Sequence, residues 1–374
     1  MKNIICITFT VLFLGACNGK ELTLLVENQS PSDRVSEIVT VDWNTIVEEL
    51  NLSVDETIVI LDNAGNQVAY QLLNEEEDKP QSLIFPADVK ANSSAKYIVK
   101  KGTPQKFDSL TYGRHVPERL DDFAWENNRI AFRMYGPALS GTISNGVDVW
   151  VKRTDSLIVN KFYNDDLKNR KSYHIDHGEG LDCYDVSWTL GAGGIAPYMN
   201  SELWIGKPYS SFQVLNNGPL RTTFILNYDS LYVDGKYLQQ KLTVSIDANS
   251  QFNKAIVVYS GESEILTLAA GIALHGGEGK LETNVETGSV TYAEDHKESG
   301  WIYVAVVLPE GISEITQDEK HVLALATNKT GQPFTYYFGA GWSKWGFETN
   351  TDWTNYVNEY IQKIKQPLKT IINH

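Results

Sequence analysis

Residues 222–246 read TTFILNYDSLYVDGKYLQQKLTVSI, and this stretch decides the fold class. Apolar and polar side chains alternate on both sides of Asp234-Gly235, which is the pattern of strands with one buried face. An Asp-Gly pair between two such runs is typical of a tight β-hairpin. The stretch therefore predicts antiparallel strands over 222–232 and 237–246, joined by a turn at 233–236.

The same alternation recurs along the chain. Residues 58–61 and 68–72 flank a second turn at 62–66, and further alternating runs cover 256–259, 301–307 and 322–326. Near the end, apolar side chains recur at helical spacing over 353–364; Thr351 can cap this helix and Pro367 stops it. We expect a mostly β, antiparallel protein that is closed by a C-terminal helix.

The first residues, MKNIICITFTVLFLGACNGK, have the layout of a secretory leader. Lys2 precedes an apolar run over 4–14 that is too short to span a bilayer, and small residues lead to Cys17. We expect a lipoprotein signal peptide over 1–16 and acylation of Cys17. The lipid would anchor the chain to the outer membrane, in the periplasm or at the cell surface. A plain secretory leader cut elsewhere is the alternative.

Charge and cysteine content limit the possible partners. The chain has 32 Lys and Arg against 47 Asp and Glu, a net charge of −15. Such a surface repels nucleic acid and anionic membranes, so we expect no nucleic-acid partner and membrane contact only through the lipid anchor. Cys183 is the one thiol left in the mature chain, so we expect no disulfide and interpret Cys183 as a small buried side chain.

A domain boundary is expected between 100 and 109, where Lys-Lys-Gly-Thr-Pro follows strand-like sequence. Residues 17–105 would form a small N-terminal β unit, with an acidic, solvated loop at 74–78. Residues 106–374 would form the main catalytic domain.

Groups that can carry chemistry concentrate in two stretches of this domain, 110–127 (LTYGRHVPERLDDFAWEN) and 173–190 (YHIDHGEGLDCYDVSWTL). A third, smaller group is HGGE at 275–278, whereas His296 and His321 stand alone, as surface histidines usually do. A charged stretch is often only a solvated face. Functional sites, however, form where several titratable groups are close enough to shift one another's pKa.

Familiar catalytic motifs are absent from the sequence. Residues 191–196 (GAGGIA) fit a dinucleotide pattern, but Pro197 blocks the helix that such a site needs. The chain has no phosphate-binding loop, no Gly-x-Ser-x-Gly and no His-Glu-x-x-His. A divalent metal is possible without any fixed ligand spacing, on Asp176, His177, Glu179 and Asp182, with His115 or His275 joining from elsewhere in the chain.

Four segments carry a resemblance to a known family: 112–127 (YGRHVPERLDDFAWEN), 130–137 (IAFRMYGP), 176–185 (DHGEGLDCYD) and 339–344 (GAGWSK). Over nearly the whole mature chain, the sequence resembles a domain family first labelled as of unknown function, which occurs in gene sets for digesting acidic polysaccharides. It is similar to the ulvan oligosaccharide dehydratases. The resemblance implies removal of water from a non-reducing-end glucuronic or iduronic acid, which leaves a 4,5-unsaturated uronate. The expected fold is an antiparallel β-sandwich of the lyase or mutarotase kind.

Dehydration of a uronate needs a base for the C5 proton, a cation for the carboxylate and an acid for the departing hydroxyl. Residue type and clustering favour His115 and His177 as the proton-transfer pair, with Tyr184 as the substitute for either. Arg114 and Arg119 would hold the acidic oligosaccharide by its carboxylate. The remaining substrate-binding candidates are Trp125 and Trp342, as flat faces for sugar rings, with Glu179 and Lys344.

Two other classes of protein remain open. A glycoside hydrolase would use two carboxylates about 5–9.5 Å apart, drawn from Asp121, Glu126, Glu179 and Asp182. A non-catalytic surface lipoprotein that captures oligosaccharides would need the aromatic residues but not the histidine and arginine clusters.

Overall fold

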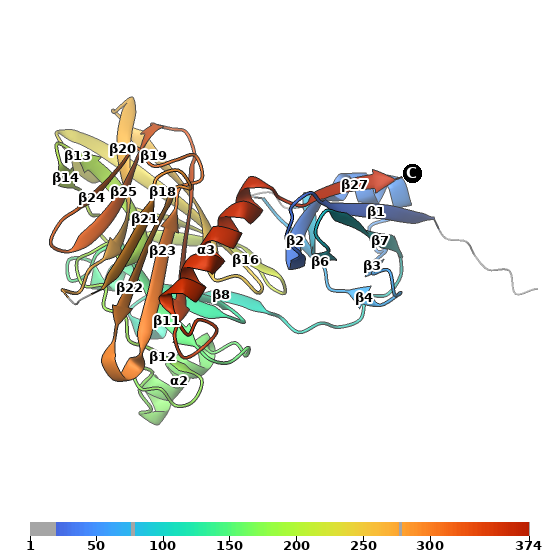
Figure 1. Ribbon diagram of the computed structural model, residues 1–374, viewed down its shortest axis with the longest axis horizontal. Coiled ribbons are helices and arrows are strands. Elements are labelled where there is room, and N and C mark those ends of the chain that lie inside the picture. Colours follow the sequence, from blue (N-terminus) through green and yellow to red (C-terminus); the bar gives the residue numbers. More distant parts are fainter. Residues whose placement is uncertain (1–19, 76–78, 277–278, 374) are drawn as a thin grey trace, which may run out of the picture.

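The computed structural model describes residues 20–75, 79–276 and 279–373. Figure 1 shows a large β-sandwich beside a smaller β unit, with the end of the chain returning from the first to the second. The mostly β, antiparallel class predicted from the sequence is confirmed.

One layer of the sandwich is a nine-stranded sheet, counted over the described residues. Its order is β15-β16-β18-β19-β26-β23-β22-β21, and β17 pairs with β18. The bounds are β15 Ser211–Asn217, β16 Arg221–Asn227, β17 Leu231–Val233, β18 Lys236–Asp247, β19 Phe252–Gly261, β26 Phe334–Trp342, β23 Trp301–Val307, β22 Ser289–Asp295 and β21 Lys280–Asn284.

The opposite layer consists of two smaller sheets. The first has the order β12-β11-β10-β9-β8 and the second β14-β13-β20-β25-β24. The bounds are β8 Thr111–Val116, β9 Asp122–Asn127, β10 Ile130–Met134, β11 Val147–Lys152, β12 Gly180–Asp182, β13 Ala192–Met199, β14 Glu202–Leu203, β20 Ile265–Ala273, β24 Glu314–Gln317 and β25 His321–Lys329.

The main hydrophobic core lies between the two layers. Phe132, Val149, Phe224, Val304 and Phe338 are among its fully buried members and come from two different sheets, one in each layer. Because side chains alternate along a strand, β9 to β11 also have a second face. That face is buried as well, beneath helix α2 (Val159–Asn169), and it carries most of the buried charge of the domain.

The predicted hairpins are confirmed. Val233 pairs with Lys236 at the turn between β17 and β18, and β16 continues the pairing along the same edge of β18. The turn at 62–66 joins β3 (Ile58–Leu61) to the short β4 (Gln67–Val68).

Helix α3 (Asn350–Lys365) covers the outer face of the nine-stranded sheet. Trp353, Val357 and Ile361 are buried against it. The cap differs from the prediction: Thr349, not Thr351, begins the helix, because its side chain accepts from the backbone of Asp352 while Asp352 accepts from the backbone of Thr349.

The smaller unit has two sheets, β27-β1-β7-β3-β4 and β2-β6-β5, with helix α1 (Trp43–Leu50). Its last strand was not predicted. The sequence analysis placed all of 106–374 in the main domain, but β27 leaves it and pairs with β1. The bounds are β1 Glu21–Asn28, β2 Arg34–Asp42, β5 Gln71–Leu73, β6 Ser82–Val89, β7 Ser93–Lys101 and β27 Lys369–Asn373.

Hydrogen bonds fix the two units against each other. The amide of Gln71 donates to the carbonyl of Arg221 and accepts from the backbone of Leu220 and Arg221. Asn74 and Asn216 exchange a reciprocal pair, each at 2.9 Å. The smaller unit is therefore held on the end of the sandwich next to β16.

No helix within the described residues is both long and apolar enough to cross a membrane. The predicted signal peptide and Cys17 lie outside the described residues.

Candidate functional site

A strained turn follows β8 and determines the geometry of the first cluster. The short helix η1 (Pro117–Arg119) ends in two consecutive non-glycine residues in left-handed backbone conformation, Leu120 (φ 53°) and Asp121 (φ 61°). The turn packs closely against Gly136, and a Cβ atom at that position would lie 1.9 Å from the carbonyl oxygen of Asp121. Tyr209 donates its hydroxyl to that same oxygen. Backbone strain of this kind concentrates at functional sites, which makes this turn a candidate.

The turn places a carboxylate beside an imidazole. His115 Nε2 lies 3.2 Å from Asp121 Oδ1, and the ring stacks on Phe212 with centroids 4.6 Å apart. Both His115 and Asp121 remain partly exposed. His115 is therefore oriented by a carboxylate and a ring, as a proton-transfer residue needs to be.

Arg119, on the same turn, has unused hydrogen-bonding capacity. Its Nη1 lies 3.8 Å from Asp122 Oδ2 but, among the described residues, makes no hydrogen bond. A quarter of the side chain is exposed. Nη1 itself is buried, so a carboxylate that approaches from solvent would meet the exposed part of the side chain rather than this nitrogen.

Asp122 begins β9 and is fully buried. Burial raises the pKa of its carboxyl group to about 6, although Arg133 and Arg119 act in the opposite direction. Tyr163 of α2 donates its hydroxyl to Asp122 Oδ2 at 3.2 Å. Asp122 thus changes its charge near neutral pH directly behind Arg119.

Asp122→Asn should flatten the pH dependence of stability. The folded-state pKa of Asp122 lies above its unfolded value of 3.8, so its contribution is fully present below that value and is lost as pH rises through about 6. On acidification from pH 7 to pH 4 we expect the unsubstituted protein to gain on the order of 3 kcal/mol relative to the variant. Denaturant unfolding measured across this range checks the result, with Asp155→Asn on the surface as control. Parallel curves for Asp122→Asn and the parent would contradict it.

Behind this turn lies a buried ionic network centred on Arg133 of β10. Its Nη2 lies 2.5 Å from Asp148 Oδ2 and 2.8 Å from Asp182 Oδ2, and its Nη1 lies 3.7 Å from Asp122 Oδ2. Burial raises the pKa of Asp148, and burial together with Asp148 raises that of Asp182. Arg133 is the common counter-charge for carboxylates of three strands, β9, β11 and β12.

Helix α2 brings the two sequence clusters together. Glu126 of β9 accepts from the backbone of Val159 at the start of α2 and pairs with Lys152 at 2.8 Å. On the helix itself, Asn160 accepts from Arg114 Nε at 2.7 Å, while Lys161 pairs with Glu179 of the second cluster. Residues 114–122 and 173–182 therefore border one helix.

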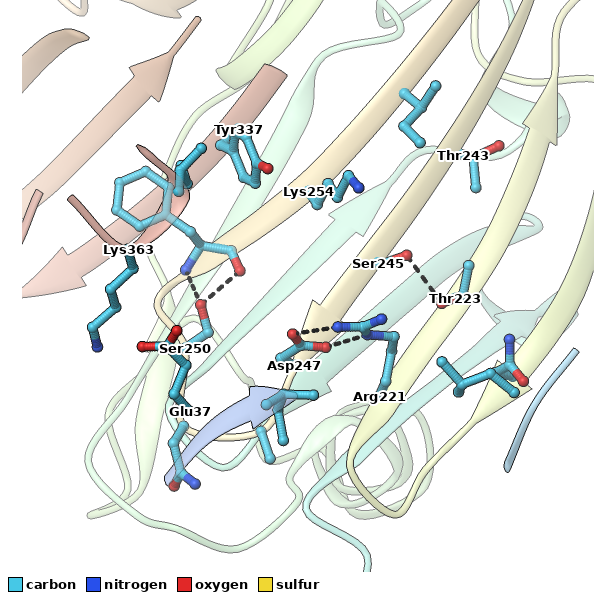
Figure 2. A pocket seen from close by; sticks show the side chains of 18 of the residues that line it. Glu37, Arg221, Thr223, Thr243, Ser245, Asp247, Ser250, Lys254, Tyr337 and Lys363 are labelled. Atoms are coloured by element: carbon cyan, nitrogen blue, oxygen red, sulfur yellow. Dashed lines mark hydrogen bonds and ion pairs between the residues drawn. The ribbon is translucent and has the colours of Figure 1, made fainter. Parts of the chain in front are cut away.

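A separate cleft of about 770 Å³ lies between the small unit, α3 and the outer face of the nine-stranded sheet. Its lining includes Arg221, Lys254, Lys363 and Tyr337. Figure 2 shows Arg221 paired with Asp247, with Lys254 further along the sheet and Lys363 on α3. Burial and the nearby Arg221 lower the pKa of Lys254. The lining also includes Lys241 and the carboxylates of Glu37, Glu75 and Asp247, so the cleft carries charges of both signs.

With the fold and these groups described, relatives of the chain can be compared with it. A family model described as a domain of unknown function, DUF4861, matches residues 26–370. The chain belongs to the DUF4861 family. A protein of Formosa agariphila (strain DSM 15362), titled Uncharacterized protein P7, is 31% identical over 324 residues, which cover 81% of each chain.

Two solved structures share the fold of this DUF4861 chain. One is a glycosyl hydrolase family 38 protein from Enterococcus faecalis, with a TM-score of 0.58 and 10% identity over 95% of this chain. The other is an α-mannosidase from Enterococcus faecalis V583, with a TM-score of 0.55 and 9% identity over 95% of this chain. The chain spans 48% and 46% of their lengths. At this identity the likeness concerns the fold alone.

Two predicted sugar platforms are wrong for this DUF4861 chain. Trp125 and Trp342 are 0% and 1% exposed. Their indole N–H groups donate to Asn253 and to the carbonyl of Ser299. Both rings therefore belong to the core and present no face to a sugar.

The expected metal ligands of the second cluster are engaged elsewhere. Asp176 pairs with Arg153 at 2.9 Å, Glu179 with Lys161, and Asp182 with Arg133. His177 lies on an exposed loop, where its Nε2 contacts the carbonyl of Ser172 at 3.1 Å. Within the described residues, no contact joins His177 to His115 as a proton-transfer pair.

Tyr184, Cys183 and Lys344 lie on another side of the sandwich, near the short helix η3 (Lys297–Ser299). Lys344 donates to the carbonyl of Glu298 at 2.5 Å, and the aromatic ring of Tyr184 lies 4.9 Å from that of His275. Burial raises the pKa of the Cys183 thiol to about 12, so it is a poor nucleophile.

Sequence reasoning missed two residues in this second region, Glu294 and His296. Together with His275 they form a compact group among the described residues. The sequence carried a signal for this pair: the two residues are two positions apart, with Glu294 near the end of β22 and His296 directly after the strand. Glu278 of the expected HGGE group lies outside the described residues.

Proposed function

We propose that the chain is a carbon–oxygen lyase that removes water from a glucuronic or iduronic acid at the non-reducing end of an ulvan-type oligosaccharide. The observation that carries this proposal is the strained turn after β8. It holds His115, paired with Asp121, and Arg119 within five residues of each other, and both side chains are about a quarter exposed.

In the proposed reaction, the carboxylate of the sugar binds Arg119 through two parallel N–H donors. The neutral imidazole of His115 takes the proton from C5, and the electron pair of that C–H bond moves toward the carboxylate as an enolate. As the pair returns to form the C4–C5 double bond, the C4–O bond breaks. The imidazolium of His115 gives its proton to the departing hydroxyl, which leaves as water, so the side chain ends the cycle neutral.

The neighbouring groups fit these roles. Asp121 orients His115 and stabilises the imidazolium that forms during transfer. Arg119 acts where negative charge develops, so it stabilises the transition state more than the ground state. Arg114, held by Asn160 and by Glu118 at 2.5 Å, precedes His115 on β8 and would serve in substrate binding.

A carbohydrate substrate is also in keeping with the comparisons, because both solved proteins of similar fold carry the names of glycan-cleaving enzymes. The hydrolase alternative has weaker support in the geometry. Glu126 and Asp182, two of its four candidate carboxylates, are buried and bound to Lys152 and Arg133. The capture alternative is favoured by one observation, the cleft of about 770 Å³ beside α3.

Product analysis separates these possibilities. Saturated uronate-ended oligosaccharides are incubated with the purified chain, and ultraviolet absorbance of the conjugated acid is followed alongside mass spectrometry. The proposal predicts rising absorbance and loss of one water without chain cleavage. Shorter products without absorbance would indicate a hydrolase, and absorbance with cleavage a chain-cleaving lyase. If the oligosaccharide binds but no product forms, the protein captures oligosaccharides without converting them, and the cleft beside α3 is the candidate binding site.

We further propose that the protein acts in the periplasm or at the cell surface, attached to the outer membrane through acylated Cys17. The proposal rests on the sequence of the leader.

A further inference from the structure

We propose that His275, Glu294 and His296 form a binding site for one divalent transition-metal ion of the zinc class. Each residue offers one ligand atom, and these three atoms lie within 4.8 Å of one another. The site lies apart from the strained turn, and its existence does not depend on the proposed reaction.

Two segments of the chain converge here, one at His275 and one at 294–296. His275 follows the end of β20, Glu294 lies near the end of β22, and His296 begins η3. The side chains of Glu294 and His296 are 9% and 15% exposed, and that of His275 is 22% exposed. The group is thus largely withdrawn from water yet open on one side, as a metal needs for entry.

The hydrogen bonds of His275 fix which nitrogen faces the group. Its Nε2 lies 2.6 Å from the carbonyl oxygen of Asp185, which can only accept, so Nε2 carries a hydrogen. Its Nδ1 then points at Glu294 Oε2, 2.5 Å away. A metal-binding histidine typically donates its second N–H to a backbone carbonyl, which orients the ring and raises its basicity. The bond to Asp185 has this form.

A second observation points into the group. His296 Nε2 is buried, lies 3.9 Å from Glu294 Oε2 and has no hydrogen-bond partner in the described chain. The hydroxyl of Tyr184 is also buried and lacks a partner among the described residues, and its ring lies 6.2 Å from that of His296. Buried polar groups without partners carry a free-energy cost, and coordination would satisfy the imidazole.

The donor set favours one class of ion. Two imidazoles and a carboxylate suit zinc and its neighbours, whereas calcium and magnesium prefer oxygen ligands alone. Ligands of a tetrahedral zinc ion lie about 3–4 Å apart, so binding would open the close His275–Glu294 contact and replace the proton shared there. Three protein ligands leave a fourth position, and the Tyr184 hydroxyl lies beside the group.

The direct test is metal binding by the chelator-treated chain. Titration calorimetry with Zn²⁺ and elemental analysis after dialysis should show one equivalent bound, with Ca²⁺ and Mg²⁺ failing to compete. Glu294→Gln and His296→Gln should each weaken binding by more than about 100-fold, beyond the 10–100-fold cost of losing an outer-shell partner. His177→Gln, an exposed histidine outside the group, should bind as the parent does. Zn²⁺ should raise the Tm of the parent and of His177→Gln but not of the other two.

If the substituted chains fail to fold, Co²⁺ bound to the unaltered chain provides a second measurement. We expect visible absorption bands of a four- or five-coordinate ion, abolished by one equivalent of Zn²⁺. A parent that binds no Zn²⁺, or a His296→Gln chain that binds it equally well, would overturn the proposal. Because no substrate is present, this outcome is independent of whether the chain eliminates water from uronates.

Discussion

His115→Ala should lower the initial rate of uronate elimination by about 10²–10⁴-fold, the usual contribution of a general acid or base. The imidazole is the group proposed to take the C5 proton, and alanine leaves nothing in its place. Because the ring is partly exposed, the loss of its stacking on Phe212 should cost only about 0.5–1.5 kcal/mol of stability. Rates are measured by ultraviolet absorbance at saturating substrate, and thermal unfolding confirms that the variant is folded.

The matched control is His177→Ala. His177 was the second proton-transfer candidate, but it is exposed and its ring lies in hydrogen-bond contact with the backbone carbonyl of Ser172. We expect its rate to stay within about threefold of the parent, well below the effect of losing a true acid or base. If His177→Ala loses activity and His115→Ala keeps it, the reaction belongs to the 173–182 segment and the role given to the strained turn is wrong.

Arg133→Met should destabilise the fold by about 3–5 kcal/mol, the usual cost of removing one partner from a buried ion pair. Methionine preserves much of the volume, so the loss is electrostatic: Asp148 and Asp182 would keep their burial without their counter-charge. Denaturant unfolding measures the effect. The control is Arg129→Met, whose pair with Asp155 is exposed and should contribute at most about 1 kcal/mol.

The loss of unfolding free energy caused by Arg133→Met should depend on pH. Arg133 opposes the rise that burial imposes on the pKa of Asp148 and Asp182, so its removal raises both further. Groups with raised folded-state pKa stabilise at low pH and lose that contribution as pH rises through the folded-state value. The variant should therefore approach the parent in acid and fall behind above neutrality. A deficit that is constant with pH, or no larger than that of Arg129→Met, would show that the network is not held by this charge.

The sequence pattern was sufficient to predict the hairpins and the last helix, because these elements are determined by residues close to one another in sequence. The alternation over 222–246 and the apolar face of α3 are properties of single segments. The predicted cap was two residues too late because both Thr349 and Thr351 precede the apolar face of the helix and either could cap it. Thr349 has Asp352 three residues later, which completes the capping box.

Side-chain roles were less predictable because they depend on what covers the second face of a strand. All residues of β9 are buried, so Trp125 and Glu126 lack the exposed side that an alternating strand normally has. The contact of Arg119 with Asp122 could be anticipated from their spacing, whereas His275 meets Glu294 and His296 only through strand order. β27 could not be foreseen, since its partner β1 lies at the other end of the chain.

Because β27 pairs with β1, the last strand of the chain belongs to a sheet of the N-terminal unit (Figure 1). Val26 pairs with Thr370 and Thr23 with Asn373, so the first and last described strands run side by side. A protease that cuts the connection over 102–110 would therefore not release the small unit. The N-terminal and C-terminal fragments would remain associated, because β27 of the C-terminal fragment is hydrogen-bonded to β1 of the N-terminal fragment.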